Sequence, residues 1–294
     1  MLPRIESTDF KGYDNLNVNS SRLFQLFKYA VYTLLAFNVY LFFDEEFAAA
    51  ALQFPDGIAP LDIIEAYSAT IDTLAWVVLL LMFELETYVL DDDRFTRPVT
   101  WTLHSLRAIC YVFIMYAFYG YMQNLAFVSD VTPLAGVTDL CALLPGEWSW
   151  AATLDEYWPI AADNCGSWSN AGAFVQFRDM PAIVDGAGHI EIVRLAWVDV
   201  INAGVWLLVV VVLEIDVRLQ EHNRYEGLAL KASNVIKFVL YSALLVAAVY
   251  WGFKGDFVDF WDAFLWLVAF VFIELNVFEW REEEKASLAA HQET

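Results

Sequence analysis

The chain has 294 residues, of which 59% are hydrophobic, and it carries a formal net charge of −22. Soluble domains contain roughly 45–50% apolar residues, so the excess argues against a soluble globular protein, and the acidic balance argues against nucleic-acid binding. The apolar residues form continuous runs rather than the alternating ten-residue segments of a membrane β-barrel. The sequence therefore predicts an all-α integral membrane protein.

Six apolar runs are long enough for helices that cross a hydrocarbon core of about 30 Å, which takes about 20 residues. They lie near Leu23–Phe43, Tyr67–Leu90, Leu106–Val128, Val193–Leu219, Val235–Phe253 and Val258–Val277. If the N-terminus is cytoplasmic, all of the 16 Lys and Arg residues except Arg178, Arg194 and Lys254 fall on the cytoplasmic side. Because short cytoplasmic loops are enriched in Lys and Arg, we expect both termini inside, in a bacterial inner membrane.

The runs divide the chain into three helical hairpins with tails and connectors. The predicted segments are a cytoplasmic tail 1–22, hairpin one 23–90, a connector 91–105, hairpin two 106–219, a connector 220–234, hairpin three 235–277 and a tail 278–294. An outer cap, residues 129–190, is inserted between the third and fourth runs. After the first run the sequence contains several acids and two prolines, and we expect these residues to form an outer loop.

The cap is rich in tryptophan and contains two cysteines, Cys141 and Cys165. An oxidising outer compartment permits a disulfide between them, whereas two free thiols too far apart to meet are the alternative. A small domain usually needs such a staple, which favours a compact cap. Its tryptophans could instead rest on the membrane interface, and the sequence leaves these two arrangements open.

A motif recurs in the second, fourth and sixth runs, with the form [Asp/Asn]-x3-Trp-x7-Glu-[Leu/Ile]-[Glu/Asp/Asn]. Its copies are Asp72/Trp76/Glu84/Glu86, Asn202/Trp206/Glu214/Asp216 and Asp262/Trp266/Glu274/Asn276. In the first, third and fifth runs a basic residue precedes a tyrosine by four positions, at Lys28, Arg107 and Lys237. The two motifs keep the same spacing in successive hairpins, which predicts a threefold internal repeat about a pseudo-threefold axis.

The repeated acids and bases are predicted to lie at the same depth, about one turn inside the cytoplasmic boundary. They are Glu84, Glu214, Glu274, Lys28, Arg107 and Lys237. Acids near helix C-termini and bases near N-termini are each unfavourable, and pairing removes both penalties. We therefore expect three acid–base pairs that close the cytoplasmic side, with the partners left open. The alternative is that the basic side chains only extend toward the headgroups.

Polar residues also lie toward the outer side of the same helices. Asp72, Asn202 and Asp262 precede the repeated Glu by about 18 Å along a helix, which indicates either a polar pathway or hydrogen bonds between helices. The repeated tryptophans suit packing. The outer loops are acidic, which would concentrate cations but is also the composition of a salt-adapted protein.

A repeated carboxylate inside the membrane predicts a channel or transporter for a cation or a proton, surrounded by the lipid bilayer. The alternative is a non-catalytic scaffold, accessory subunit or sensor that binds a protein partner through the cap. The four His residues show no metal-ligand spacing, and no phosphate loop or nucleophile elbow is present. We therefore expect no enzyme activity, cofactor or metal.

Overall fold

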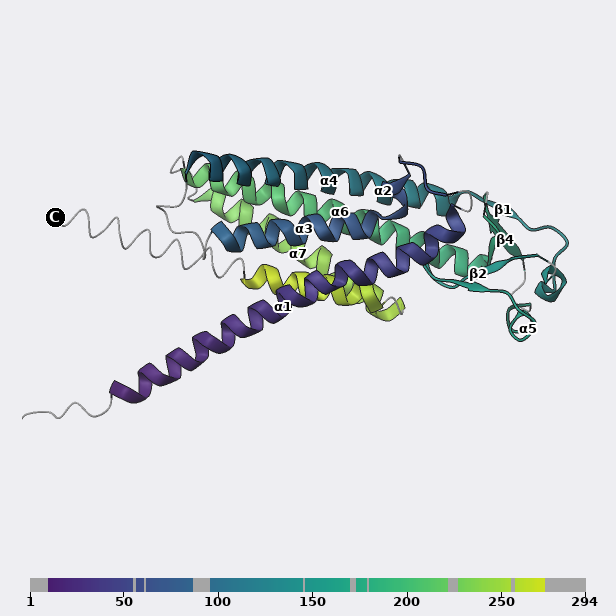
Figure 1. Ribbon diagram of the computed structural model, residues 1–294, viewed down its shortest axis with the longest axis horizontal. Helices are drawn as coiled ribbons and strands as arrows, with labels where there is room; N and C mark the ends of the chain where they lie inside the picture. Colours follow the sequence, from purple (N-terminus) through teal and green to yellow (C-terminus); the bar gives the residue numbers. More distant parts are fainter. Residues whose placement is uncertain are drawn as a thin grey trace, which may run out of the picture.

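The computed structural model consists of a bundle of long helices, which α1 crosses obliquely, with a small β-rich segment at one end (Figure 1). The long helices are α1 (Phe10–Gln53), α3 (Ser68–Glu84), α4 (Arg97–Ser129), α6 (Gly186–Glu221) and α7 (Leu228–Lys254). Residues 257–272 are also helical. The structure describes residues 10–54, 57–60, 62–86, 96–144, 146–169, 173–178, 180–221, 227–254 and 257–272.

The first helix is longer than predicted at both ends. It begins at Phe10, inside the predicted tail, and it continues past Phe43 to Gln53. The expected loop at this point is therefore wrong for residues 44–53. The extension contains a run of alanines, the strongest helix former, and it stops shortly before Pro55, where helices are disfavoured.

Four of the described helices are long and apolar enough to cross a membrane, by length and composition. They are Leu23–Gln53, Arg97–Ser129, Gly186–Asp216 and Leu228–Lys254. The other two predicted spans correspond to α3, which has 17 residues, and to residues 257–272. A membrane-embedded helical protein is thus supported, and the number of six spans stays a prediction.

The helices pack so that apolar residues fill the bundle and also cover its outside. Helix α3 packs against α1 and α4, and α6 packs against α4 and α7. Leu35 and Val209 are fully buried between the helices, whereas Phe238 is 72% exposed and Val246 68% exposed. Soluble proteins rarely expose extended apolar surfaces, so these outward faces fit a lipid environment.

The cap contains a five-stranded sheet that the all-α prediction did not include. Its strands are β1 (Val131–Pro133), β2 (Ser149–Ala151), β3 (Tyr157–Pro159), β4 (Phe174–Phe177) and β5 (Ala182–Asp185). Their order is β1-β4-β5-β2-β3, with β2 and β5 parallel and the other pairs antiparallel. Strands of three or four residues are too short to show a clear alternating pattern in sequence, so an all-α class is incomplete.

The predicted disulfide joins Cys141 and Cys165, whose Cα atoms lie 5.0 Å apart. It links the 3-10 turn Leu140–Leu143 (η3) to the short helix α5 (Cys165–Trp168). Beside it, the rings of Trp150 and Trp168 stack with centroids 5.3 Å apart. Trp150 and Trp168 therefore pack within the cap, whereas Trp158 is 50% exposed, and a place of the cap tryptophans at the membrane interface stays a prediction.

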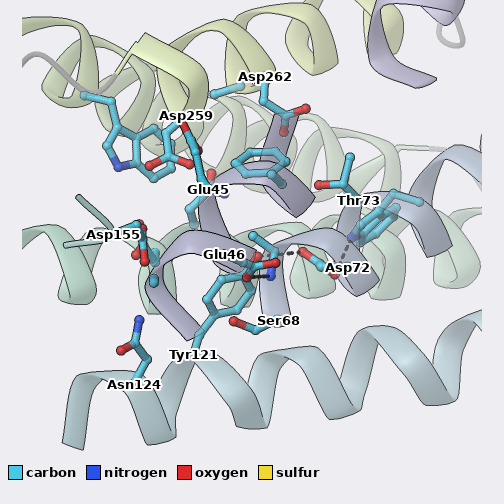
Figure 2. A pocket seen from close by; sticks show the side chains of 18 of the residues that line it. Glu45, Glu46, Ser68, Asp72, Thr73, Tyr121, Asn124, Asp155, Asp259 and Asp262 are labelled. Carbon is cyan, nitrogen blue, oxygen red and sulfur yellow. Dashed lines mark hydrogen bonds between the residues drawn. The ribbon is translucent and has the colours of Figure 1, made fainter. Parts of the chain in front are cut away.

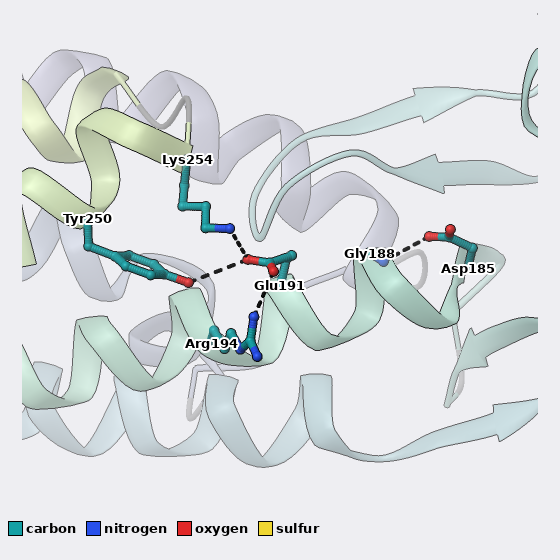
Figure 3. Close-up of polar contacts among 6 residues, drawn as sticks. All are labelled: Asp185, Gly188, Glu191, Arg194, Tyr250 and Lys254. Carbon is teal, nitrogen blue, oxygen red and sulfur yellow. Dashed lines mark hydrogen bonds and ion pairs between the residues drawn. The ribbon is translucent and has the colours of Figure 1, made fainter. Parts of the chain in front are cut away.

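The cap shares an apolar core with the bundle, where Phe177 and Val184 of the sheet pack in one cluster with Trp251 of α7. Next to this core, Figure 3 shows Glu191 of α6 between two bases. Its carboxylate lies 2.6 Å from Lys254 of α7 and 2.8 Å from Arg194. The shared apolar core thus packs the sheet of the cap against the bundle, while the ion pairs of Glu191 join α6 to α7.

Removing the disulfide should loosen the cap. We expect Cys141→Ser to lower the free energy of unfolding by about 3 kcal/mol, since the bridge closes a loop with a sequence separation of 24. Thermal unfolding in detergent, with and without reductant, measures the effect. Cys110→Ala changes the buried free cysteine and is the control. The melting temperature of this variant should fall on addition of reductant, as that of the wild type does. A wild type whose melting temperature ignores reductant would contradict the prediction.

Candidate functional site

A cavity of about 80 Å³ lies at the cap end of the bundle. All the long helices, residues 257–272 and the cap contribute residues to its lining. Eight of these residues are carboxylates: Glu45, Glu46, Glu65, Asp72, Asp155, Asp199, Asp259 and Asp262. Figure 2 shows several of them around the same space. Residues from distant parts of the sequence therefore build a single acidic site.

The described residues that line the cavity include no Lys, Arg or His. Carboxylates that share a site repel one another when they are ionised, so protonation or a nearby cation stabilises them. The lining can therefore bind positive charge in the form of protons or of a cation.

The helix α3 contributes to the site through its N-terminus. Glu46 of α1 accepts hydrogen bonds from the backbone N–H of Ala69 at 2.7 Å and of Thr70 at 3.0 Å, and from the Thr70 hydroxyl at 2.6 Å. The first N–H groups of a helix have no partner within it, and the helix dipole favours an anion there. The Glu46 carboxylate thus holds α1 against α3 at the cavity wall.

The three predicted outer polar residues, Asp72, Asn202 and Asp262, all line this cavity. The indole N–H of Trp76 donates to Asp72 at 3.0 Å, and the amide of Asn38 donates to Asp262 at 2.8 Å. The side-chain oxygen of Asn202 is buried without a hydrogen-bond partner. The equivalent positions thus meet at one site, but each has a different set of contacts.

Two further carboxylates reach the cavity from outside the long helices. Glu65 belongs to the short helix α2 (Ile63–Ala66), and Asp155 lies between β2 and β3 of the cap. Burial and then the charge of Asp62 raise the pKa of the Glu65 carboxyl above its ordinary value, which favours proton binding there. Burial and then the charge of Asp155 raise the pKa of the neighbouring Tyr157.

Three tryptophans lie about one helical turn deeper than the polar residues. The centroids of Trp76 and Trp206 lie 6.1 Å apart, those of Trp76 and Trp266 6.3 Å, and those of Trp206 and Trp266 6.4 Å. All three line the cavity, and Trp206 and Trp266 are more than nine-tenths buried. The triangle they form closes the cavity on the side away from the cap.

Beyond the tryptophans, the repeated bases contact acids. Lys28 Nζ lies 2.6 Å from Glu84 Oε1, and both side chains are buried. Lys237 Nζ lies 3.2 Å from Asp216, which also accepts a hydrogen bond from Ser233 at 2.7 Å. The buried Lys28 and Asp216 show that these charges do not simply extend into the headgroups.

The third pair joins Arg107 to Glu86 at 2.6 Å. Two of the bases therefore pair with the acid two positions after the repeated Glu, at Glu86 and Asp216. Side chains two positions apart on a helix point to roughly opposite faces, and Glu214 is accordingly exposed while Asp216 is 3% exposed. Glu274, the third predicted acid, lies outside the described residues.

Several residues of the cavity did not stand out in the sequence, among them Glu46, Asp155 and Trp251. They belong to no repeat, and they meet the repeated residues only through the fold. The sequence does show many acids after the first predicted span, but such acids are also typical of a salt-adapted protein. The cavity therefore contains the predicted residues Asp72, Asn202 and Asp262 together with acids and a tryptophan that were not predicted.

Comparisons with known proteins give no relative from which a function could be transferred. No protein-family model matches the chain, and no curated protein and no solved structure matches it. The acidic cavity, the tryptophan triangle and the ion pairs are therefore the observations on which a function must rest.

The buried pair of Lys28 and Glu84 should be sensitive to losing one partner. We expect Lys28→Met to lower the free energy of unfolding by about 3–5 kcal/mol, because it leaves a buried carboxylate without its base. Thermal unfolding in detergent measures this. Arg194→Met, which removes an exposed ion pair to Glu191, should cost below about 1 kcal/mol. Equal effects of the two variants would contradict a special role for the buried pair.

Proposed function

We propose that the protein is a channel or transporter for a cation or a proton, and that the acidic cavity is its entry site. The observation that carries the proposal is the convergence of eight carboxylates in a cavity without a basic residue among its described lining. Repeated carboxylates within membrane helices are costly and commonly mark ion pathways. A negative site of this kind attracts cations and protons and repels anions.

The proposal places the cap and the cavity outside and both termini in the cytoplasm. The distribution of Lys and Arg supports this orientation. The threefold repeat of hairpins is part of the same proposal, and two observations support it. The three equivalent tryptophans contact one another, and the pairs Arg107–Glu86 and Lys237–Asp216 have the same sequence separation, 21 residues.

The pathway we propose runs from the acidic cavity past the tryptophan triangle to the ion pairs on the other side. Trp76 connects the cavity to the triangle. The indole N–H of Trp76 donates to Asp72 at 3.0 Å, and the ring of Trp76 contacts Trp206 and Trp266. An ion bound at Asp72 would weaken this hydrogen bond and free the ring to move. The triangle is thus the closed position of a gate that responds to the occupied cavity.

Flux into liposomes tests the proposal directly. We expect Asp72→Asn and Asp262→Asn each to lower cation or proton flux roughly tenfold, which corresponds to about 1.4 kcal/mol of lost attraction. Both substitutions keep the size of the side chain and its hydrogen-bonding oxygen. Glu191→Gln, at the exposed ion pairs outside the cavity (Figure 3), is the matched control and should keep the wild-type flux.

No flux above that of empty liposomes, or equal loss in all three variants, would refute the conduit for the ions tested. Each variant is first compared with the wild type by thermal unfolding, so that loss of folding is separated from loss of transport. A proton-sensitive dye and a potassium-sensitive dye, used in parallel, show which of the two species moves.

A non-catalytic scaffold or sensor is the second candidate, and the edge of the cap favours it. Strand β3 is the last strand of the sheet, and its Trp158 is 50% exposed. Edge strands pair readily with a further strand from another chain. If this function is the right one, Trp158→Ala abolishes capture of a protein partner while Asp72→Asn leaves that capture unchanged.

A further inference from the structure

The acidic cavity contains a hydrogen-bond donor that the protein leaves unused. Trp251 lines the cavity and is 3% exposed, yet its indole N–H has no hydrogen-bond partner. A buried N–H without an acceptor costs about 1–3 kcal/mol, and buried polar groups in native proteins are nearly always paired. The unused donor therefore indicates that the cavity accommodates a molecule with an acceptor atom.

Asn202 offers the complementary group in the same cavity. Its side-chain oxygen is buried without a partner, so it can accept a hydrogen bond from a bound molecule. The eight carboxylates favour a positively charged molecule. A molecule that accepts from Trp251, donates to Asn202 and balances the carboxylates has a cationic N–H donor and a separate acceptor.

The remaining lining distinguishes between kinds of cation. Among the described residues, no three carboxylate, imidazole or thiol groups lie close enough together to hold a metal ion. Aromatic rings line the cavity beside the acids, with Trp76, Trp206, Trp266 and Trp251 among them. Aromatic faces, tryptophan above all, attract organic ammonium groups.

The size of the cavity agrees with such a molecule. A buried water molecule needs a cavity of about 10–15 Å³, so the cavity of about 80 Å³ holds several groups of that size. A metal ion in this space would need water molecules as further ligands, because the described residues offer no group of three acidic, imidazole or thiol ligands. A molecule of a few non-hydrogen atoms would fill it and contact acids and rings together.

We propose that the acidic cavity binds a small organic ammonium ion that also carries a hydrogen-bond acceptor. This inference rests on the proposed function, because it names the class of cation that enters the proposed pathway. The ammonium group contacts the carboxylates, the aromatic faces and Asn202, and the acceptor takes the hydrogen bond of Trp251.

Calorimetric titration of the full-length protein in nanodiscs tests this with three probes at equal ionic strength. Ethanolammonium has both groups, ethylammonium lacks the acceptor, and sodium is the metal ion. We expect ethanolammonium to bind most tightly. Trp251→Phe should weaken ethanolammonium binding by roughly 2- to 10-fold, the effect of one hydrogen bond, and leave ethylammonium binding unchanged.

Trp101→Phe is the matched control, because Trp101 is 74% exposed on α4 and does not line the cavity. If Trp251→Phe does not fold, Asn202→Ala tests the same site and should weaken both ammonium ions. Tighter binding of sodium than of ethanolammonium would overturn the inference, and so would an equal effect of Trp251→Phe on the two ammonium ions. Absence of any ammonium binding, which leaves water as the occupant, would overturn it as well.

Binding and flux separate this inference from the proposed function. Flux of protons or potassium without ammonium binding overturns the inference and leaves the conduit intact. Ammonium binding by a protein that moves no cation, including labelled ethanolammonium, supports the inference and refutes the conduit.

Discussion

The cost of removing charge from water shapes the whole bundle. An isolated ionised group in an apolar interior is very unfavourable unless it is paired or hydrogen-bonded. The two ends of this bundle meet the requirement in different ways. Lys28 and Lys237 pair with acids at the end away from the cap, whereas Glu46 and Asp262 accept hydrogen bonds from neutral donors at the cavity. In these ion pairs the charges of acid and base offset each other, whereas the described lining of the cavity holds eight acids and no base.

The tryptophan triangle lies between the acidic cavity and the ion pairs. Its rings, with centroids 6.1–6.4 Å apart, form an apolar layer between the cavity and the ion pairs, and electrostatic interactions are stronger in apolar surroundings. A charge that left the cavity would cross this layer only if the rings moved. Because Trp76 is also a hydrogen-bond donor to Asp72, the contents of the cavity and the position of the ring are linked.

The parts of the site that recur at a fixed spacing could be predicted from the sequence. Asp72, Asn202 and Asp262 recur at a fixed spacing, and the fold brings them to one cavity. The other parts of the site could not, because they depend on the rotation of a helix or on residues far away in the sequence. The rotation of a helix selects Asp216 over Glu214, and the spacing alone gives no rotation. Asp155 comes from a loop of the cap, and strands of three residues carry too little pattern to predict that loop.

The second copy of the motif departs from the others, and the departure has a physical consequence. Carboxylates at all three of these motif positions would place three like charges in one cavity, each raising the cost of ionising the next. Asn202 removes one of these charges but keeps an oxygen at the same place. Asp72 and Asp262 use their oxygens to bind Trp76 and Asn38, whereas the Asn202 oxygen has no partner. Asn202 is therefore the one position of the three that offers a neutral acceptor. A bound molecule that donates to this acceptor has one preferred orientation, which three identical side chains would not give it.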